Sequence, residues 1–333
     1  MNVCIVGAGA IGGFLAVKLA LAGAKVTAIM RGANLAAVKA NGLTLIEEEN
    51  EHHVRDVVAT DNLAEVGPHD LVILAMKANQ VTPVAKQLAP LLRADTPVVT
   101  MQNGIPWWYF QKHGGEFDGR CIESVDPGGV IAEAIAVDRV IGCVVYPACE
   151  IVAPGVIRHI EGNRFPVGEL DGAETSRVAA IASLFKKAGL KSPVLTDIRS
   201  EIWLKLWGNL TFNPISALTH ATLVDICRFP PTRALAVSLM TEAQTIANRL
   251  GIEFRVTLER RIAGAEAVGK HKTSMLQDVE AGRMLEIDAL VGSVIELGRL
   301  TQTPTPHIDA VYACASLLAN MLRESGGRLT LTQ

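Results

Sequence analysis

The stretch "NVCIVGAGAIGGFLAVKLALAGAKVTAIMRG", residues 2–32, predicts a β-strand, a glycine turn, an α-helix and a second strand. The first strand, Val3 to Val6, leads into Gly7-x-Gly9-x-x-Gly12, and the second strand runs from Lys25 to Met30. In such a turn the first glycine permits a tight bend, the second lets the backbone approach a pyrophosphate, and the third lets the helix pack on the sheet. Because these glycines lie between a strand and a helix, the pattern is typical of a dinucleotide-binding fold.

The start of the predicted helix suits phosphate groups. Its first backbone amides, at Ala10, Ile11 and Gly12, are donors for phosphate oxygens, and the helix dipole adds partial positive charge there. The alternative is a glycine turn that binds no ligand.

The residue after the second strand indicates which cofactor binds. Sites that prefer NAD usually place Asp or Glu there to bind the ribose 2′-hydroxyl. Here the strand ends in Arg31-Gly32, and no acidic residue lies between Val26 and Ala40. Since a cation suits a 2′-phosphate, we expect NADP(H); the alternative is that Arg31 is a solvated surface residue.

Size and composition favour a two-domain protein of the cytoplasm. The chain has 333 residues, and a single core usually stops growing at ~250–300. A net charge of −3 without a run of basic residues argues against a nucleic-acid partner. The six cysteines form no CxxC pair, so we expect reduced thiols and no metal site.

One segment could be mistaken for a targeting sequence. Residues 3–17 are uncharged, but no basic region precedes them, and the nucleotide-binding turn accounts for their glycines. No other segment approaches the ~20 apolar residues of a membrane span. We therefore expect no membrane partner.

Further strands are predicted along the first half, at residues 42–48, 52–60, 70–77 and 97–104. A helix over 80–94 separates the last two, which makes them parallel. Lys77 and Asn103-Gly104 then follow the carboxyl ends of these strands, where open α/β sheets bind ligands. The alternative is that both are only turn formers.

The region 139–170 predicts three strands, which we expect to be antiparallel additions to the sheet. A helix over 174–188 and a short strand over 191–196 follow. The first domain is expected to comprise residues 1–196, and the second domain residues 197–333. In the second domain helices are predicted at 197–213, 231–251, 256–268, 274–299 and 306–323.

The first helix of the second domain carries an unusual polar edge. Lys205, Asn209 and Asn213 lie at a spacing of one helical turn within the apolar segment "IWLKLWGNLTFNPIS". Pro214 is expected to end or kink the helix there. One interpretation is purely structural: the lysine reaches water and the asparagines bind backbone carbonyls. The alternative is that these three side chains line a cleft. In a cleft, burial lowers the pKa of a lysine and makes it a better proton donor.

A second polar set lies at 271–293. Ser274 with Gln277 predicts a capping box, which needs no function. Glu286 is expected either to pair with Arg283 on a helix surface or, from a face of small residues, to partner Lys205.

With these residues the chain resembles the ketopantoate reductases (2-dehydropantoate 2-reductases) over nearly its whole length. The shared motifs are Gly7-x-Gly9-x-x-Gly12, Arg31, "MK" ending at Lys77, "QNG" at 102–104, K-x-x-x-N-x-x-x-N-P at 205–214, and "SMLQD" at 274–278 followed by Glu286.

The resemblance implies a Rossmann domain followed by a helical domain, and NADPH-dependent reduction of 2-dehydropantoate to (R)-pantoate on the way to pantothenate. By resemblance, the glycines and Arg31 hold NADPH, with Lys77 and Asn103 near its ribose and nicotinamide. Lys205 is the general acid and Glu286 orients it. The substrate's hydroxyl and carboxylate are held by Asn209, Asn213 and Ser274.

Two features depart from the family pattern. Leu223 stands where a further substrate-binding asparagine is expected, and the long aromatic segment after Asn103, with Trp107 and Trp108, can reshape the pocket mouth. The same mechanism acting on another branched 2-oxo acid, as in a D-2-hydroxyacid dehydrogenase, therefore stays open. So does an NADP(H)-binding sensor without turnover. A homodimer is compatible with the sequence.

Overall fold

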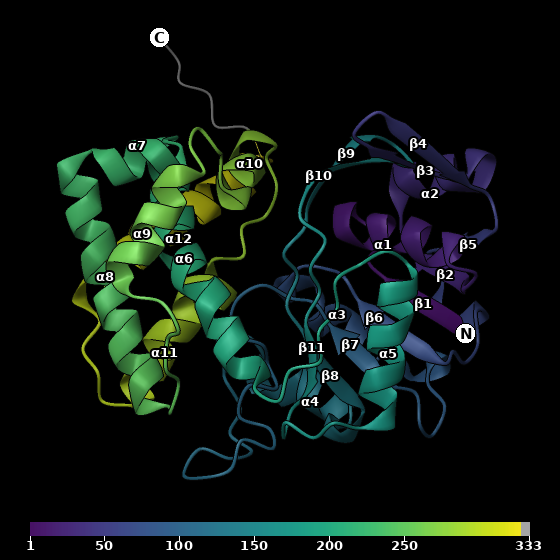
Figure 1. Ribbon diagram of the computed structural model, residues 1–333, viewed down its shortest axis with the longest axis horizontal. Coiled ribbons are helices and arrows are strands. Elements are labelled where there is room, and N and C mark those ends of the chain that lie inside the picture. The colour runs from purple at the N-terminus through teal and green to yellow at the C-terminus, as the bar shows by residue number, and fades with distance from the viewer. Residues whose placement is uncertain (328–333) are drawn as a thin grey trace. The chain divides into compact units, whose positions relative to one another are not determined.

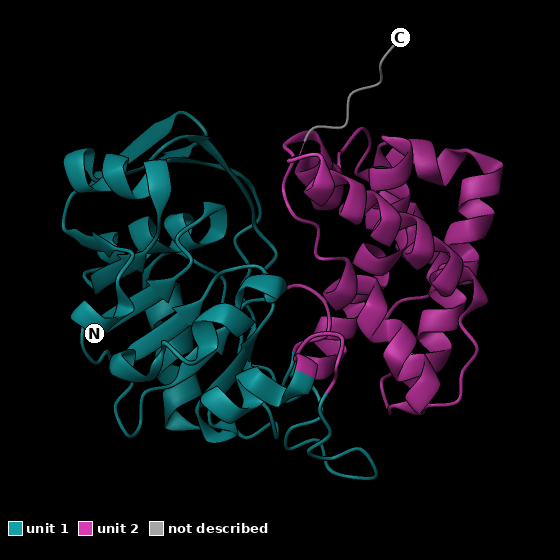
Figure 2. Ribbon diagram, turned by 180° about the vertical axis from the view of Figure 1, so that it is seen from behind, with its two compact units in different colours: residues 1–102, 107–121, 128–198 teal, residues 103–106, 122–127, 199–333 magenta. Residues whose placement is uncertain are grey.

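The computed structural model describes residues 1–327 and divides into two compact units, coloured separately in Figure 2. Unit 1 comprises residues 1–102, 107–121 and 128–198; unit 2 comprises 103–106, 122–127 and the chain from residue 199 onward. Two short segments of the first half therefore belong to the second unit. The domain boundary after residue 196 stays a prediction.

Unit 1 is built on a seven-stranded sheet with the order β11-β8-β7-β6-β1-β2-β5 (Figure 1). Neighbouring strands from β5 to β8 are parallel, and β11 is antiparallel to β8. The strand order reverses between β1 and β6, and open α/β sheets bind ligands at such a point. The strands are β1 (Asn2–Val6), β2 (Lys25–Ile29), β5 (Val57–Thr60), β6 (Leu71–Leu74), β7 (Val98–Thr100), β8 (Val140–Cys143) and β11 (Val167–Glu169).

A second, four-stranded sheet has the order β4-β3-β10-β9. Its strands are β3 (Leu43–Glu47), β4 (Asn50–Val54), β9 (Ala148–Ala153) and β10 (Val156–Glu161). Helix α1 (Ala10–Leu21) contacts β1 and β2 of the large sheet and all four strands of the small one. Because both sheets cover it, α1 is apolar on nearly every side and buries the whole run from Gly12 to Val17.

The remaining helices of unit 1 are α2 (Gly32–Asn41), α3 (Thr82–Ala85), α4 (Val130–Ala134) and α5 (Ser176–Lys187). The expected continuous helix over 80–94 is wrong, because only α3 and flanking 3₁₀ turns form there. Pro83 stands in the first turn of α3, where proline is tolerated. Pro90 has no amide hydrogen and cannot continue a helix.

Three strand predictions are also corrected. The expected strand 52–60 is two strands in different sheets, β4 and β5. The region 139–170 holds four strands rather than three: β8 is parallel to β7, and β9 and β10 belong to the small sheet. Residues 191–196 form only isolated bridges, at Lys191 and Val194. The pattern of one segment cannot show which sheet a strand joins, because its partner strand can be distant along the chain: β10 pairs with β3, and β8 pairs with β7.

Unit 2 is helical. Its helices are α6 (Ile198–Thr219), α7 (Leu223–Arg228), α8 (Pro230–Arg249), α9 (Leu258–Ala267), α10 (Ser274–Glu280), α11 (Ser293–Leu300) and α12 (Pro306–Glu324), with a π-helical turn at Asp288–Gly292. The expected helix 274–299 is therefore broken after Glu280, where Gly282 adopts a positive φ of 62°. Helix α7 was not expected.

Helix α6 continues past Pro214, so the prediction that it ends there is wrong. An interior proline costs about 3 kcal/mol. The five residues beyond it include Ile215 and Ala217, which are 3% and 1% exposed, so tertiary packing favours helix there despite the proline. Asn213 consequently lies inside the helix and not at its end.

No helix formed by residues 1–327 is long and apolar enough to cross a membrane. Unit 1 confirms the expected α/β fold with a mostly parallel sheet, and unit 2 confirms the expected helical second part.

Candidate active site

The glycine turn has the geometry that the sequence predicts. Gly7 has a φ of 95°, and a side chain there would lie 2.8 Å from the Cβ of Met76, in the loop after β6. A side chain at Gly12 would lie 2.4 Å from the carbonyl oxygen of Gly7. At Gly9 no atom comes within 4 Å of the side-chain position, which leaves the backbone open to a ligand.

The N-terminus of α1 is suited to an anion. Gly9 is its N-cap and offers no side-chain acceptor, and the first turn contains no acidic residue. The amides of Ala10, Ile11 and Gly12 therefore remain available as donors. These residues fit the pyrophosphate of a dinucleotide.

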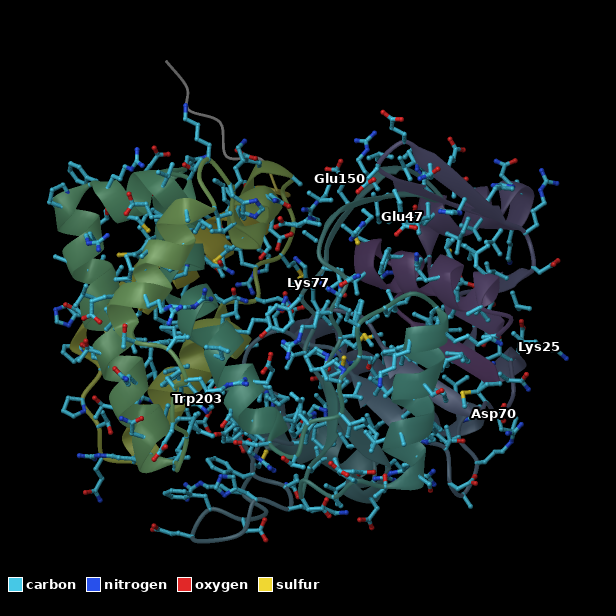
Figure 3. All side chains as sticks on the ribbon, viewed as in Figure 1. Lys25, Glu47, Asp70, Lys77, Glu150 and Trp203 are labelled. Atoms are coloured by element: carbon cyan, nitrogen blue, oxygen red, sulfur yellow. The ribbon has the colours of Figure 1, made fainter. Side chains whose placement is uncertain are left out.

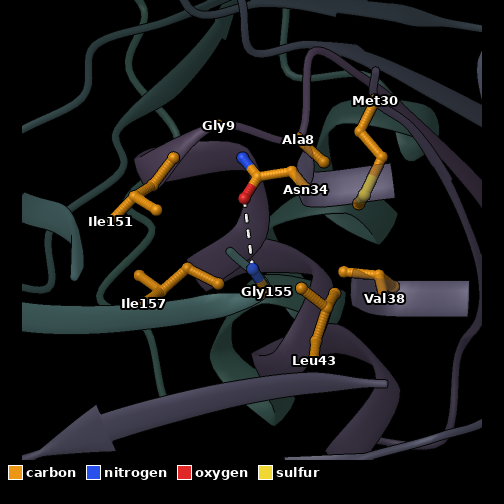
Figure 4. A pocket seen from close by; sticks show the side chains of 9 residues that line it. All are labelled: Ala8, Gly9, Met30, Asn34, Val38, Leu43, Ile151, Gly155 and Ile157. Carbon is orange, nitrogen blue, oxygen red and sulfur yellow. Dashed lines mark hydrogen bonds between the residues drawn. The ribbon is translucent and has the colours of Figure 1, made fainter. Parts of the chain in front are cut away.

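Arg31 is exposed and caps α2, whose first turn also lacks an acidic residue. The side-chain oxygen of Asn34 in that helix accepts the amide of Gly155 at 3.1 Å. This bond ties the β9–β10 hairpin beside the glycine turn, so that Ile151 and Ile157 line a small cavity together with Gly9 (Figure 4). No local signal could have linked Ile151 to Gly9, because only the folding of the small sheet brings them together.

Lys77 follows β6, at the same end of the sheet as the glycine turn. Figure 3 shows it at the opposite end of this strand from Asp70. It begins a 3₁₀ turn, and its amide donates to the side chain of Gln80 at 3.3 Å.

In unit 2 the structure brings Lys205 and Asn103 together. Nζ of Lys205 donates to Oδ1 of Asn103 at 2.5 Å, although 102 residues separate them. Both side chains are half-buried. An amide oxygen at this distance holds one N–H of the amine and so fixes the orientation of the group.

The polar edge of α6 continues toward α10. Asn209 is half-buried and Asn213 is only 5% exposed. Nδ2 of Asn213 lies 3.5 Å from Oγ of Ser274, the longest distance that a hydrogen bond allows. Four predicted site residues thus form two contacting pairs, with Asn209 between them along the helix.

The predicted capping role of Ser274 is wrong. Thr273 is the N-cap of α10, and its hydroxyl accepts the amide of Leu276 at 3.3 Å. Gln277 donates instead to the carbonyl of Lys272. Because the cap lies one residue earlier, the hydroxyl of Ser274 is available to Asn213.

Glu286 lies in the irregular segment between α10 and the π-helical turn. Residues 283–286 are not helical, so the helix surface on which Glu286 was expected to pair with Arg283 does not form. Arg283 binds Asp278 with an Nε to Oδ1 distance of 2.8 Å. The helical stripe of small residues expected around Glu286 is likewise absent, since the helix is broken there. Glu286 is half-buried, and its carbonyl oxygen accepts the amide of Leu290 at 3.1 Å. Its partnership with Lys205 stays a prediction.

The two departures from the family pattern also have places in the structure. Leu223 begins α7, half-buried, and its amide donates to the carbonyl of His271, three residues before Ser274. Trp107 and Trp108 are 4% and 1% exposed within unit 1, and Trp108 donates to Thr100 at 2.7 Å. Because these rings are core residues, the expectation that the aromatic segment shapes a pocket mouth does not hold for them.

A parallel sheet with a glycine turn at its switch point, followed by a helical unit with a lysine on a polar edge, defines a dinucleotide-dependent oxidoreductase of the Rossmann class. Residues 3–115 match the family pattern described as ketopantoate reductase PanE/ApbA, and residues 197–319 match its C-terminal part. The chain belongs to the ketopantoate reductase family.

Individual relatives agree with this family assignment. The chain is 56% identical to a 2-dehydropantoate 2-reductase of Mesorhizobium japonicum, over 96% of this chain and 98% of that protein. A solved structure from Ralstonia solanacearum, assigned to the ketopantoate reductases, has a TM-score of 0.92 at 43% identity and covers 96% of this chain and 98% of its own. D-mandelate dehydrogenase, solved with NADH and anilino(oxo)acetate, shares the fold at 21% identity with a TM-score of 0.81, over 97% of this chain and 99% of its own.

Proposed function

We propose that this protein reduces 2-dehydropantoate (ketopantoate) to (R)-pantoate with NADPH, a step of pantothenate biosynthesis. The observation that carries the chemistry is the amine of Lys205, held 2.5 Å from the amide oxygen of Asn103 on the polar edge of α6. The substrate is inferred from the relative of 56% identity, whose name is 2-dehydropantoate 2-reductase.

Reduction of a ketone needs a hydride and a proton. When bound, NADPH supplies the hydride to the carbonyl carbon. Lys205 donates a proton from Nζ to the carbonyl oxygen, so that a hydroxyl forms and the neutral amine is reprotonated from solvent. Asn103 keeps one N–H of the amine occupied, and Glu286 is proposed as the second group that orients it.

The remaining proposed site residues bind the cofactor or the substrate. Residues 1–196 are proposed to hold NADP(H), and residues 197–333 the substrate and the proton donor. The amides that follow Gly7 and Gly9 would hold the pyrophosphate, Arg31 would hold the 2′-phosphate, and Lys77 and Asn103 would bind near the ribose and nicotinamide. Asn209, Asn213 and Ser274 bind the hydroxyl and carboxylate of the substrate.

The setting proposed for this activity is the cytoplasm, with a small 2-oxo acid as the partner. We also include a homodimer in the proposal; light scattering of the purified protein measures it directly.

The test follows NADPH absorbance with ketopantoate in the wild type and in Lys205→Ala. We expect kcat to fall about 10²- to 10⁴-fold, the usual contribution of a general acid, while NADPH binding, followed by fluorescence, is kept. Lys86→Ala is the matched control, since the side chain of Lys86 is 67% exposed. In a second arm, we expect Arg31→Ala to raise KM for NADPH and to leave KM for NADH unchanged.

Three outcomes would contradict the proposal. If 2-oxoisovalerate is reduced and ketopantoate is inert, the enzyme is a D-2-hydroxyacid dehydrogenase for another branched 2-oxo acid, and Leu223 becomes the first residue to examine. If NADPH binds and no 2-oxo acid is reduced, the result supports an NADP(H)-binding sensor without turnover. Unchanged turnover in Lys205→Ala removes that lysine from the chemistry.

A further inference from the structure

The π-helical turn at Asp288–Gly292 changes which backbone groups of this region can bind elsewhere. In an α-helix the amide of Ser293 would donate to Ala289, four residues earlier. Here it donates to the carbonyl of Asp288, five residues earlier, as a π-helix requires. Single π turns inside helices are frequent at functional sites.

The carbonyl of Ala289 holds the segment that carries Asn103. It accepts the amide of Ile105 at 3.0 Å and the hydroxyl of Ser293 at 2.7 Å. Ala289 is 3% exposed, Ser293 is fully buried and Ile105 is 1% exposed. These bonds are therefore protected from water, and the Ile105 backbone has a fixed position relative to the turn.

Gly104 permits this close approach. Its φ is 87°, and a side chain there would lie 2.0 Å from the carbonyl oxygen of Ala289 and 2.5 Å from its carbonyl carbon. Any other residue at position 104 would displace the segment from the π turn. The residue before it is Asn103, whose amide oxygen accepts from Lys205.

We infer that the π-helical turn positions the proposed catalytic amine: the Ala289 carbonyl holds the Gly104–Ile105 backbone, and this fixes the Asn103 amide oxygen against Lys205. Gly104 and Ser293 are positioning residues that act through Asn103 and do not touch the substrate. The inference rests on the proposed function of Lys205. It also ties Glu286 into the same unit, because the amide of Leu290 within the turn donates to the Glu286 carbonyl.

The outer side of the turn is braced by α12. The hydroxyl of Tyr312 donates to Oδ1 of Asp288 at 2.7 Å, and a side chain at Gly292 would lie 3.2 Å from the Tyr312 ring. Helix α12 thus holds the π-helical turn from one side. The turn itself holds the segment of Asn103, through the hydrogen bond from the Ile105 amide to the Ala289 carbonyl.

The test is a cycle of kcat values for Gly104→Ala in the wild type and in Lys205→Ala. If Gly104 acts through Lys205, the substitution lowers kcat at least about tenfold in the wild type and has little further effect once the lysine is gone, because coupled groups are non-additive. The affinity for NADPH is expected to stay within about threefold of the wild type. The substitution should therefore change kcat more than it changes KM for NADPH. Equal losses of kcat in both backgrounds would overturn the inference.

Gly115→Ala is the matched control. Gly115 has a φ of 78°, but no atom lies within 4 Å of its side-chain position. Gly115→Ala carries the same backbone penalty of a positive φ, but its new side chain meets no neighbouring atom. Its kcat is therefore expected to match the wild type. A loss of kcat in Gly115→Ala as large as in Gly104→Ala would assign the effect to general strain and contradict the inference.

Ser293→Ala covers the case in which Gly104→Ala does not fold. It removes one hydroxyl from the Ala289 carbonyl and leaves the backbone unchanged. The control Ser238→Ala removes a hydroxyl of α8 that also binds the carbonyl four residues earlier, that of Ala234, but in a hydrogen bond that is exposed. We expect a smaller fall in kcat for Ser293→Ala alone, again absent in the Lys205→Ala background. An unchanged kcat for Ser293→Ala contradicts the inference, whereas failure of the proposed function is recognised separately, by unchanged turnover in Lys205→Ala.

Discussion

His69 shows how burial sets the chemistry of a single side chain in the nucleotide-binding sheet. It is 5% exposed, with Nδ1 donating to the carbonyl of Gly67 and Nε2 accepting from the hydroxyl of Thr27, both at 2.9 Å. This arrangement uses the neutral ring. Burial is the main cause that lowers the pKa of His69 below 6.5, and the nearby Arg93 lowers it further.

The lowered pKa of His69 gives a stability prediction with a definite sign. Above about pH 6.5 the ring is neutral in both the folded and the unfolded chain. As the pH falls below that value the unfolded chain binds the proton first, so the free energy of unfolding decreases until the folded pKa is reached. Urea unfolding at several pH values measures this, and His69→Gln should flatten the decrease.

The control for His69 is His220→Asn, at an exposed position whose φ of 59° asparagine tolerates. Its pH profile of unfolding should follow the wild type. A decrease as steep in His69→Gln as in the wild type would show that other groups cause it.

Among elements, α10 places a structural residue and a proposed substrate-binding residue at adjacent positions. Thr273 caps the helix and Ser274 contacts Asn213. We expect Thr273→Ala to lower the free energy of unfolding by about 1 kcal/mol, the usual value of an N-cap, with little change in kcat. Ser274→Ala should instead raise KM for the substrate roughly 10- to 100-fold, the range for a hydrogen bond to a charged group, with little change in stability. Urea unfolding and steady-state kinetics on both variants decide this, and the reverse pattern would restore Ser274 as the cap.

Helix α6 shows the limit of reasoning from one element. Its polar edge could be identified from spacing alone, because residues four apart on a helix share a face. The end of α6 could not be identified from the sequence, because Pro214 predicts that the helix stops there. The packing of the following turn overrides this local preference. A proline rule describes the local cost, whereas burial of Ile215 and Ala217 depends on the rest of unit 2.

At the scale of the whole molecule, segments 103–106 and 122–127 tie the first half of the chain to unit 2. The carboxylate of Glu296 accepts the amides of Glu123 and Ser124 at 2.9 and 2.8 Å, and Ala289 accepts that of Ile105. A fragment of residues 1–196 lacks these acceptors, and Ile105 and Ile122 lose their cover.

We therefore expect fragment 1–196 to unfold at lower urea concentration than the intact chain and to bind NADPH more weakly. Addition of fragment 197–333 should restore both properties, because it returns the acceptors without a covalent link. Fluorescence titration and urea unfolding measure these effects. A fragment 1–196 as stable alone as in the mixture would indicate that the two segments need no support from unit 2.

The sequence by itself determined the nucleotide-binding turn, the parallel sheet around it and the edge of Lys205, Asn209 and Asn213. These features depend on glycine geometry, strand pattern and helical period, all of which act over a few residues. It also indicated Asn103-Gly104 as a candidate ligand site at a strand end, with a simple turn as the alternative.

Only the tertiary structure decided which of these residues meet. It brought Asn103 to Lys205 across 102 residues, split the expected strand 52–60 between two sheets, and moved the cap of α10 to Thr273. It also placed the Ala289 carbonyl of a π turn against Gly104. Such contacts depend on the packing of elements that are distant along the chain, and local propensity carries no information about which of them will share a core.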